Sequence, residues 1–68
     1  MSDGQVTIAI DAMGGENSPY KVLKGAQIFQ NKNQNVKMIF FGNKTEITSN
    51  IRKFKIDISN YEIVNTTE

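Results

Sequence analysis

One polar, glycine-rich stretch holds most of the groups in this sequence that could do chemistry. It follows a short apolar run and comprises Asp11, Ala12, Met13, Gly14, Gly15, Glu16, Asn17 and Ser18. Adjacent glycines let the backbone take a positive φ and approach a ligand closely. Free amides at a helix start attract anions, because the helix dipole places roughly half a positive charge there. The stretch therefore predicts an anion site, with phosphate as the natural ligand.

Two carboxylates in this stretch oppose a bound anion. A carboxylate about 4 Å from a phosphate charge would cost on the order of 4 kcal/mol at an effective dielectric constant of 20. A structural alternative therefore stays open, in which Asp11 accepts hydrogen bonds from loop amides and Glu16 complements the dipole of the following helix. The spacing matches neither the dinucleotide fingerprint nor the P-loop, so the glycine pair alone is weak evidence.

A strand and a helix are predicted on either side of the glycine-rich stretch. Residues 6–10 form an apolar run typical of a strand in a parallel sheet. Pro19 has a φ already suited to a helix, so a helix is predicted from Pro19 to about Gln30. The hydroxyl of Ser18 could cap this helix, which would be worth about 1 kcal/mol.

The predicted helix has one apolar face. Val22, Ala26 and Phe29 recur at helical spacing, with Leu23 alongside, and we expect them to face the core. Gly25 costs about 1 kcal/mol relative to alanine in a helix. It predicts a close approach of helix to strand, and simple tolerance is the alternative.

Two more strands and one more helix follow. Residues 36–41 are almost continuously apolar, which predicts a strand covered on both faces. Gly42 and Asn43 end it, and Asn43 with Glu46 resembles a capping box before a helix near residues 44–53. That helix could end near Arg52, where strand-like alternation begins. Residues 61–64 are the third predicted strand, and residues 65–68 begin a loop.

This order predicts an open parallel α/β sheet of βαβαβ order, a Rossmann-like three-layer arrangement with right-handed crossovers. The strand order stays open. Ligands of such sheets bind beyond the carboxyl ends of the strands. That edge collects the loops of residues 11–18, 42–44 and 65–68.

Composition excludes several classes of function. The 68 residues carry a net charge of +1 and contain neither cysteine nor histidine, which excludes disulfides, thiolate metal sites and a histidine general base. Scattered lysines give no nucleic-acid footprint. No apolar run is long enough to span a bilayer, and the N-terminus lacks a signal-peptide layout, so we expect a cytoplasmic protein of at most one domain.

Residues 8–15, followed by Pro19 and residues 22–26, resemble the N-terminus of the PlsX family of bacterial phosphate acyltransferases. Residues 39–42 and 61–65, with 67–68, resemble later segments of that family. Two positions depart from the family pattern. Glu16 stands where the family usually has aspartate, and Asn43 stands where it usually has aspartate after glycine.

The resemblance implies an enzyme much longer than this chain, which would be the N-terminal part of a larger α/β domain and inactive alone. Such an enzyme would be a homodimer, associated peripherally with the inner face of the membrane. It would transfer a fatty acyl group from acyl carrier protein to inorganic phosphate in phospholipid synthesis, with neither metal nor nucleotide.

The resemblance also assigns roles to residues of the loops. Gly14 and Gly15 would contact polar groups of the substrate through their backbone, and Asp11 would hold the loop or orient a cation. The remaining candidates are Glu16, Asn17 and Ser18 in the same loop, and Gly42 and Asn43 in a second loop. Two alternatives stay open, a nucleotide-binding half-domain and a non-catalytic remnant of a split gene.

Overall fold

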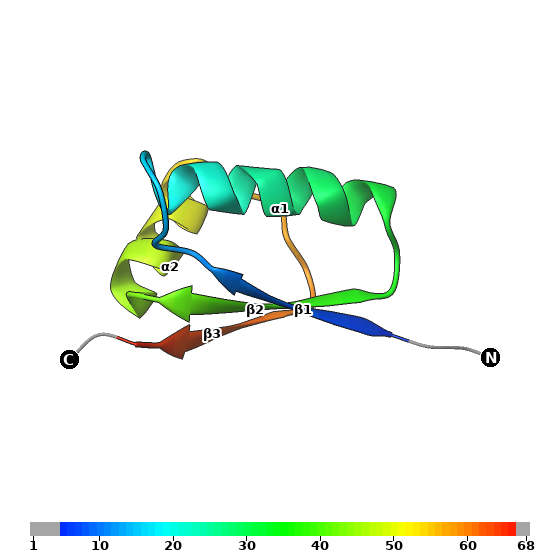
Figure 1. Ribbon diagram of the computed structural model, residues 1–68. Helices are drawn as coiled ribbons and strands as arrows, with labels where there is room; N and C mark the ends of the chain where they lie inside the picture. Colours follow the sequence, from blue (N-terminus) through cyan, green and yellow to red (C-terminus); the bar gives the residue numbers. More distant parts are fainter. Residues whose placement is uncertain (1–4, 67–68) are drawn as a thin grey trace.

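A three-stranded parallel sheet with two helices makes up the fold (Figure 1). The computed structural model describes residues 5–66. Along the chain the elements are β1 (Val6–Asp11), α1 (Tyr20–Lys32), β2 (Val36–Gly42), α2 (Lys44–Lys53) and β3 (Tyr61–Asn65). Both strand pairs are parallel, which confirms the predicted open α/β sheet and its βαβαβ order.

The strand order, which the sequence left open, is β1-β2-β3. Ile8 pairs with Met38, and Phe40 pairs with Ile63. Each connection moves one strand further in the same direction, so right-handed crossovers place both helices on one face of the sheet. Figure 1 shows α1 and α2 on that common side.

The core lies between this sheet face and the helices. Leu23 is fully buried and Ala26 nearly so, whereas Phe29 is 43% exposed. The prediction that Phe29 faces the core was therefore wrong. The fully or almost fully buried side chains are Ala12, Leu23, Ala26, Val36, Met38, Phe40, Ile47, Ile56 and Ile58.

Gly25 does not bring α1 close to a strand. An added Cβ at this position would meet no atom of residues 5–66 within 4 Å, so the predicted close approach is wrong for this part of the chain and the alternative of tolerance holds. Gly25 instead lines an apolar groove of about 310 Å³ beside β1. Phe29 lines the same groove, because residues 5–66 place no further strand beyond β1 for it to cover.

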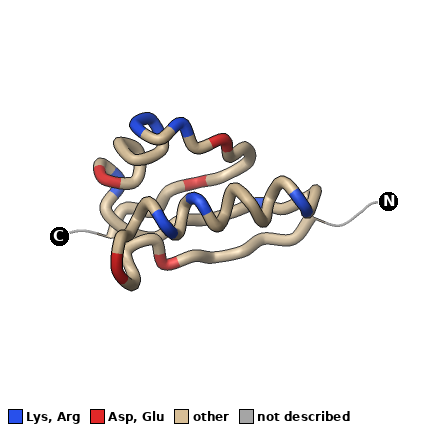
Figure 2. Tube along the Cα trace, turned by 90° about the horizontal axis from the view of Figure 1, so that it is seen from above, with Lys and Arg blue, Asp and Glu red and all other residues tan. Residues whose placement is uncertain are grey.

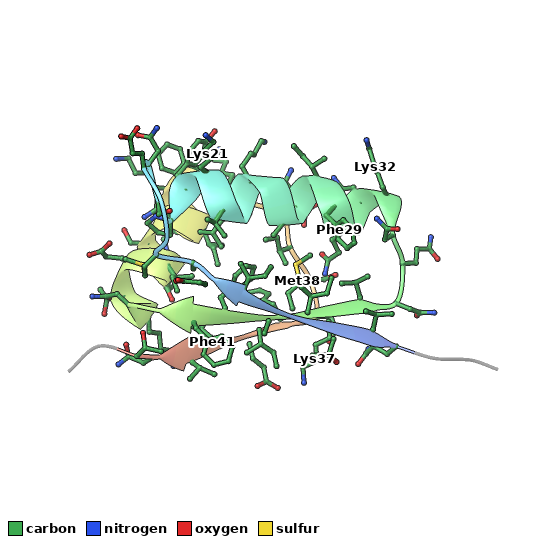
Figure 3. The ribbon with its side chains drawn as sticks, viewed as in Figure 1. Lys21, Phe29, Lys32, Lys37, Met38 and Phe41 are labelled. Atoms are coloured by element: carbon green, nitrogen blue, oxygen red, sulfur yellow. The ribbon has the colours of Figure 1, made fainter. Side chains whose placement is uncertain are left out.

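The sheet face opposite the helices is uncovered in residues 5–66. Phe41 and Val64 are 36% and 39% exposed there, and Lys37 pairs with Glu62 across β2 and β3 at 2.6 Å between Nζ and Oε2. Figure 3 shows Phe41 and Lys37 on the side away from the helices. The expectation that β2 is covered on both faces is therefore wrong for this part of the chain, and its strands and helices form two layers.

The second helix follows its sequence signals closely. The Asn43 side chain accepts a hydrogen bond from the Glu46 amide at 3.0 Å, which confirms the predicted cap. The alternating segment after α2 is not a strand. Ile56 and Ile58 are buried in the core although they belong to a coil connection. The alternation in the sequence misled the prediction, because a coil can also alternate buried and exposed residues without pairing with a strand.

The charged residues do not gather in one place on the helical layer. Viewed from above the helices, Lys and Arg are spread along both of them (Figure 2). Across residues 5–66, neither helix is long and apolar enough to cross a membrane.

Candidate functional site

The three loops predicted at the carboxyl edge of the sheet lie together there. The Ala12 amide donates to the Phe41 carbonyl at 2.9 Å, and the Thr66 amide donates to the Gly42 carbonyl at 2.9 Å. The Asn65 side chain accepts from the Lys44 amide at 3.2 Å. These bonds fix the loops to one another. Residues 67 and 68 of the third predicted loop lie outside the described residues.

The glycine pair gives the first loop its turn. Gly15 has a φ of 86°, which confirms the prediction that one glycine of the pair takes a positive φ. Asn17 follows with a φ of 64°. Within residues 5–66, the consecutive amides of Gly15, Glu16 and Asn17 donate no hydrogen bond to a protein acceptor. These three N–H groups are therefore available to an external acceptor just before α1.

Asp11 holds the start of this loop. Its Oδ1 accepts a hydrogen bond from the Met13 amide at 3.0 Å, as the structural alternative expected. A Cβ added to Gly14 would lie 3.3 Å from Asp11 Oδ2, so the carboxylate packs against the glycine backbone. Both carboxylate oxygens thus lie close to the backbone of residues 13 and 14. The catalytic role suggested for Asp11 stays a prediction.

Ser18 closes the loop and does not cap the helix. Its hydroxyl donates to the Gly14 carbonyl, while Pro19 occupies the N-cap position and makes no side-chain cap bond. Helix α1 begins at Tyr20, one residue later than predicted. The predicted Ser18 cap is therefore wrong, because proline takes the capping position and the hydroxyl turns back into the loop.

Glu16 lies too early in the chain to complement the α1 dipole. It precedes the cap, and the first turn of α1 contains no acidic residue. Helix-dipole effects fall off within one turn, so the expected stabilisation by Glu16 is not present. Its side chain is exposed.

The second predicted loop of the site consists of Gly42 and Asn43. In the structure both residues have structural roles. A Cβ added to Gly42 would lie 2.5 Å from Met13 Cγ and 3.2 Å from Ile47 Cδ1. The missing side chain makes room for Met13, which belongs to the first loop. Sequence reasoning gave Met13 no role. One signal was present, since Met13 is the single large apolar side chain in the polar stretch of residues 11–18.

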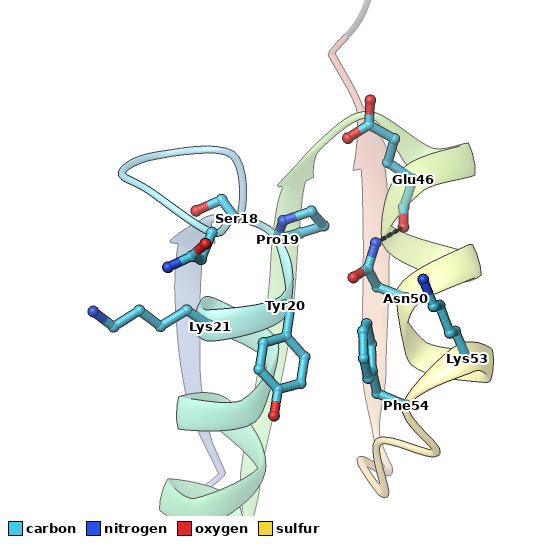
Figure 4. A pocket seen from close by; sticks show the side chains of 9 residues that line it. Ser18, Pro19, Tyr20, Lys21, Glu46, Asn50, Lys53 and Phe54 are labelled. Carbon is cyan, nitrogen blue, oxygen red and sulfur yellow. Dashed lines mark hydrogen bonds between the residues drawn. The ribbon is translucent and has the colours of Figure 1, made fainter.

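A groove of about 640 Å³ extends from the loop between α1 and α2. Asn17 and Ser18 line its loop end, and Glu46 and Asn50 line the α2 side. Figure 4 shows the ring of Tyr20, the first residue of α1, beside that of Phe54, which follows the end of α2, and their centroids are 4.4 Å apart. The groove thus has a polar end beside the free amides and an aromatic end between the helices.

Comparison with known proteins identifies relatives that match almost all of the chain. Residues 6–68 match the family described as "Fatty acid synthesis protein". A phosphate acyltransferase of Oenococcus oeni is 42% identical over 66 residues, which cover 97% of this chain and 18% of that relative.

Two further relatives carry the same name. A phosphate acyltransferase of Pelagibacter ubique is 36% identical over 63 residues, with 93% of this chain and 18% of the relative covered. That of Pediococcus pentosaceus is 38% identical over 61 residues, with 90% and 16% covered. The chain spans less than a fifth of the length of these curated relatives. Because the family match covers almost every residue, the chain belongs to the fatty acid synthesis protein family, the family of phosphate acyltransferases that its glycine-rich stretch resembles.

Proposed function

We propose that this chain supplies the phosphate-binding loop of an acyltransferase that moves a fatty acyl group from acyl carrier protein to inorganic phosphate. One observation carries the proposal. The amides of Gly15, Glu16 and Asn17 have no protein acceptor within residues 5–66, and they lie just before α1 at the carboxyl edge of a parallel sheet. Consecutive free amides in a tight turn can form a concave surface that binds an anion such as phosphate.

The proposed reaction needs little more than placement of its reactants. A phosphate oxygen attacks the thioester carbonyl, the carbon–sulfur bond breaks, and the products are an acyl phosphate and a free thiol. Binding the phosphate in a fixed orientation removes much of the entropic barrier to this attack. An amide that is not used for phosphate can donate to the oxyanion that develops on the carbonyl.

The remaining features of the proposed enzyme are those that its family membership suggests. We propose that acyl carrier protein and acyl-chain contacts lie in the length that the relatives have beyond this segment. We also propose that the enzyme is a homodimer in the cytoplasm that associates peripherally with the membrane. Its proposed reaction uses neither a metal nor a nucleotide.

A chimeric enzyme tests the proposal directly. In the chimera, residues 6–68 of this chain replace the matching segment of the Oenococcus oeni phosphate acyltransferase. We expect the chimera to release thiol from an acyl carrier protein thioester only when phosphate is present, with a phosphate KM near that of the parent enzyme. Gly15→Val in the chimera should raise this KM.

Two results would count against the proposal. A chimera that has the circular dichroism and dimer size of its parent but no phosphate-dependent thiol release would overturn it. A nucleotide that raises the Tm of the chimera, when phosphate does not, would favour the nucleotide-binding alternative.

A further inference from the structure

Met13 reaches from the first loop to the end of β2. Its Cγ and Sδ would lie 2.5 and 3.1 Å from a Cβ on Gly42, so the Met13 side chain occupies the space that any other residue at position 42 would fill. Ile47 of α2 borders the same space at 3.2 Å from Cδ1. One side chain of the first loop is thus seated between β2 and α2.

This contact anchors the loop on the β1 side of its free amides. Ala12 is fully buried and bonded to Phe41, which fixes the residue before Met13. Met13 itself is 36% exposed, so burial alone does not hold its side chain. Its amide is tied to Asp11, and its side chain is confined by the bare backbone of Gly42. The next residues are the glycine pair, where the amides without a protein acceptor in residues 5–66 begin.

We infer that Met13 and Gly42 act together as positioning residues for the anion-binding loop. Gly42 contacts no substrate in this assignment. It admits the Met13 side chain, and Met13 sets the height of the glycine turn above the sheet edge. That the loop binds phosphate rests on the proposed function. That Met13 and Gly42 constrain each other sterically rests only on the contact between them.

The inference has a specific energetic consequence. A methyl group at Gly42 would collide with the Met13 Cγ, an atom close to the backbone and not the far end of a flexible chain. Relief of the collision therefore requires a new Met13 rotamer or a shift of the loop. A displacement of about 1 Å in a positioning group can cost roughly 100-fold in rate. Met13→Ala removes the colliding atoms, so the two changes are coupled.

A double-mutant cycle in the chimera tests this coupling. We expect Gly42→Ala to raise the phosphate KM by about 10- to 100-fold. Met13→Ala should raise it less, and the double variant should be no worse than Met13→Ala alone, because the new methyl group then has room. Gly25→Ala is the matched control, since an added Cβ there meets no atom of the described residues within 4 Å, and its phosphate KM should stay that of the unmodified chimera.

The outcomes separate this inference from the proposed function. If the effects on phosphate KM add, the positioning inference is wrong. It is also wrong if Tm shows the coupling while phosphate KM does not change, because the contact then serves packing alone. If the unmodified chimera shows no phosphate dependence although Tm is coupled, the proposed function fails and the steric contact remains.

Discussion

Replacing Gly15 tests whether the anion-binding loop depends on its left-handed backbone. The φ of Gly15 is 86°, and within the part of the chain that the structure describes an added Cβ would meet no atom within 4 Å. A substitution there therefore causes no collision with neighbouring groups, and its cost comes from the backbone conformation itself. For a residue with a Cβ in the left-handed region this cost is about 1–2 kcal/mol. Valine, which is β-branched, is disfavoured more strongly than alanine at positive φ.

The loop can respond to this cost in two ways. It can keep its shape, and the free energy of unfolding then falls by about 1–2 kcal/mol for Gly15→Ala. It can instead relax to a negative φ, and the amides of Glu16 and Asn17 then turn away from their present direction. We expect a lower Tm, a higher phosphate KM or both, with Gly15→Val more affected than Gly15→Ala. Scanning calorimetry and thiol release by the chimera measure the two quantities.

Two variants control the Gly15 experiment. Gly15→Asn should be the mildest change, because asparagine tolerates positive φ and Asn17 already has a φ of 64° in the same loop. Gly25→Ala, inside α1 and without a neighbour within 4 Å, should raise stability by up to about 1 kcal/mol. Unchanged Tm and unchanged phosphate KM in both Gly15→Ala and Gly15→Val would refute the reasoning about this loop.

Three further predictions concern the cap of α2, the Asp11 carboxylate and the isolated chain. In the chimera, Asn43→Ala should lower the free energy of unfolding by about 1 kcal/mol in urea titrations, whereas Asn43→Asp should preserve the cap and the stability. Asp11→Ala should cost about 1 kcal/mol, but Asp11→Asn keeps an oxygen for the Met13 amide and should retain the parent Tm; an equal loss in both would contradict the hydrogen-bond account. The isolated 68-residue chain should show no sharp thermal transition and no thiol release, because one sheet face is uncovered, and a cooperative calorimetric peak would disprove this.

The elements of the fold could be predicted because their signals are local. Apolar runs mark the three strands. The start of α2 is marked by a signal only four residues long, from Asn43 to Glu46. The strand order could not be predicted, since the sequence does not show on which face of the sheet each crossover helix lies. Phe29 was misassigned for the same reason. Helical spacing groups it with Ala26, but only the sheet's extent decides whether a strand lies beneath it.

The site was predictable in its backbone and less so in its side chains. Positive φ at Gly15 follows from a glycine pair between a strand and a helix. Ser18 was misassigned because a serine before a proline can cap the helix or bond back into the loop, and the sequence does not choose between them. The apolar type of Met13 in a polar loop hinted at a packing role, but its partner Gly42 is far away in the chain, so no local pattern could identify the contact.

The position of bound phosphate tests the central claim most directly. A crystal structure of the chimera with phosphate, in which residues 6–68 come from this chain, would locate the anion relative to the loop. The account predicts phosphate oxygens within hydrogen-bonding distance of the amides of Gly15, Glu16 and Asn17, in front of the start of α1. Phosphate bound elsewhere in an active chimera, with these amides facing solvent or a protein acceptor, would contradict it.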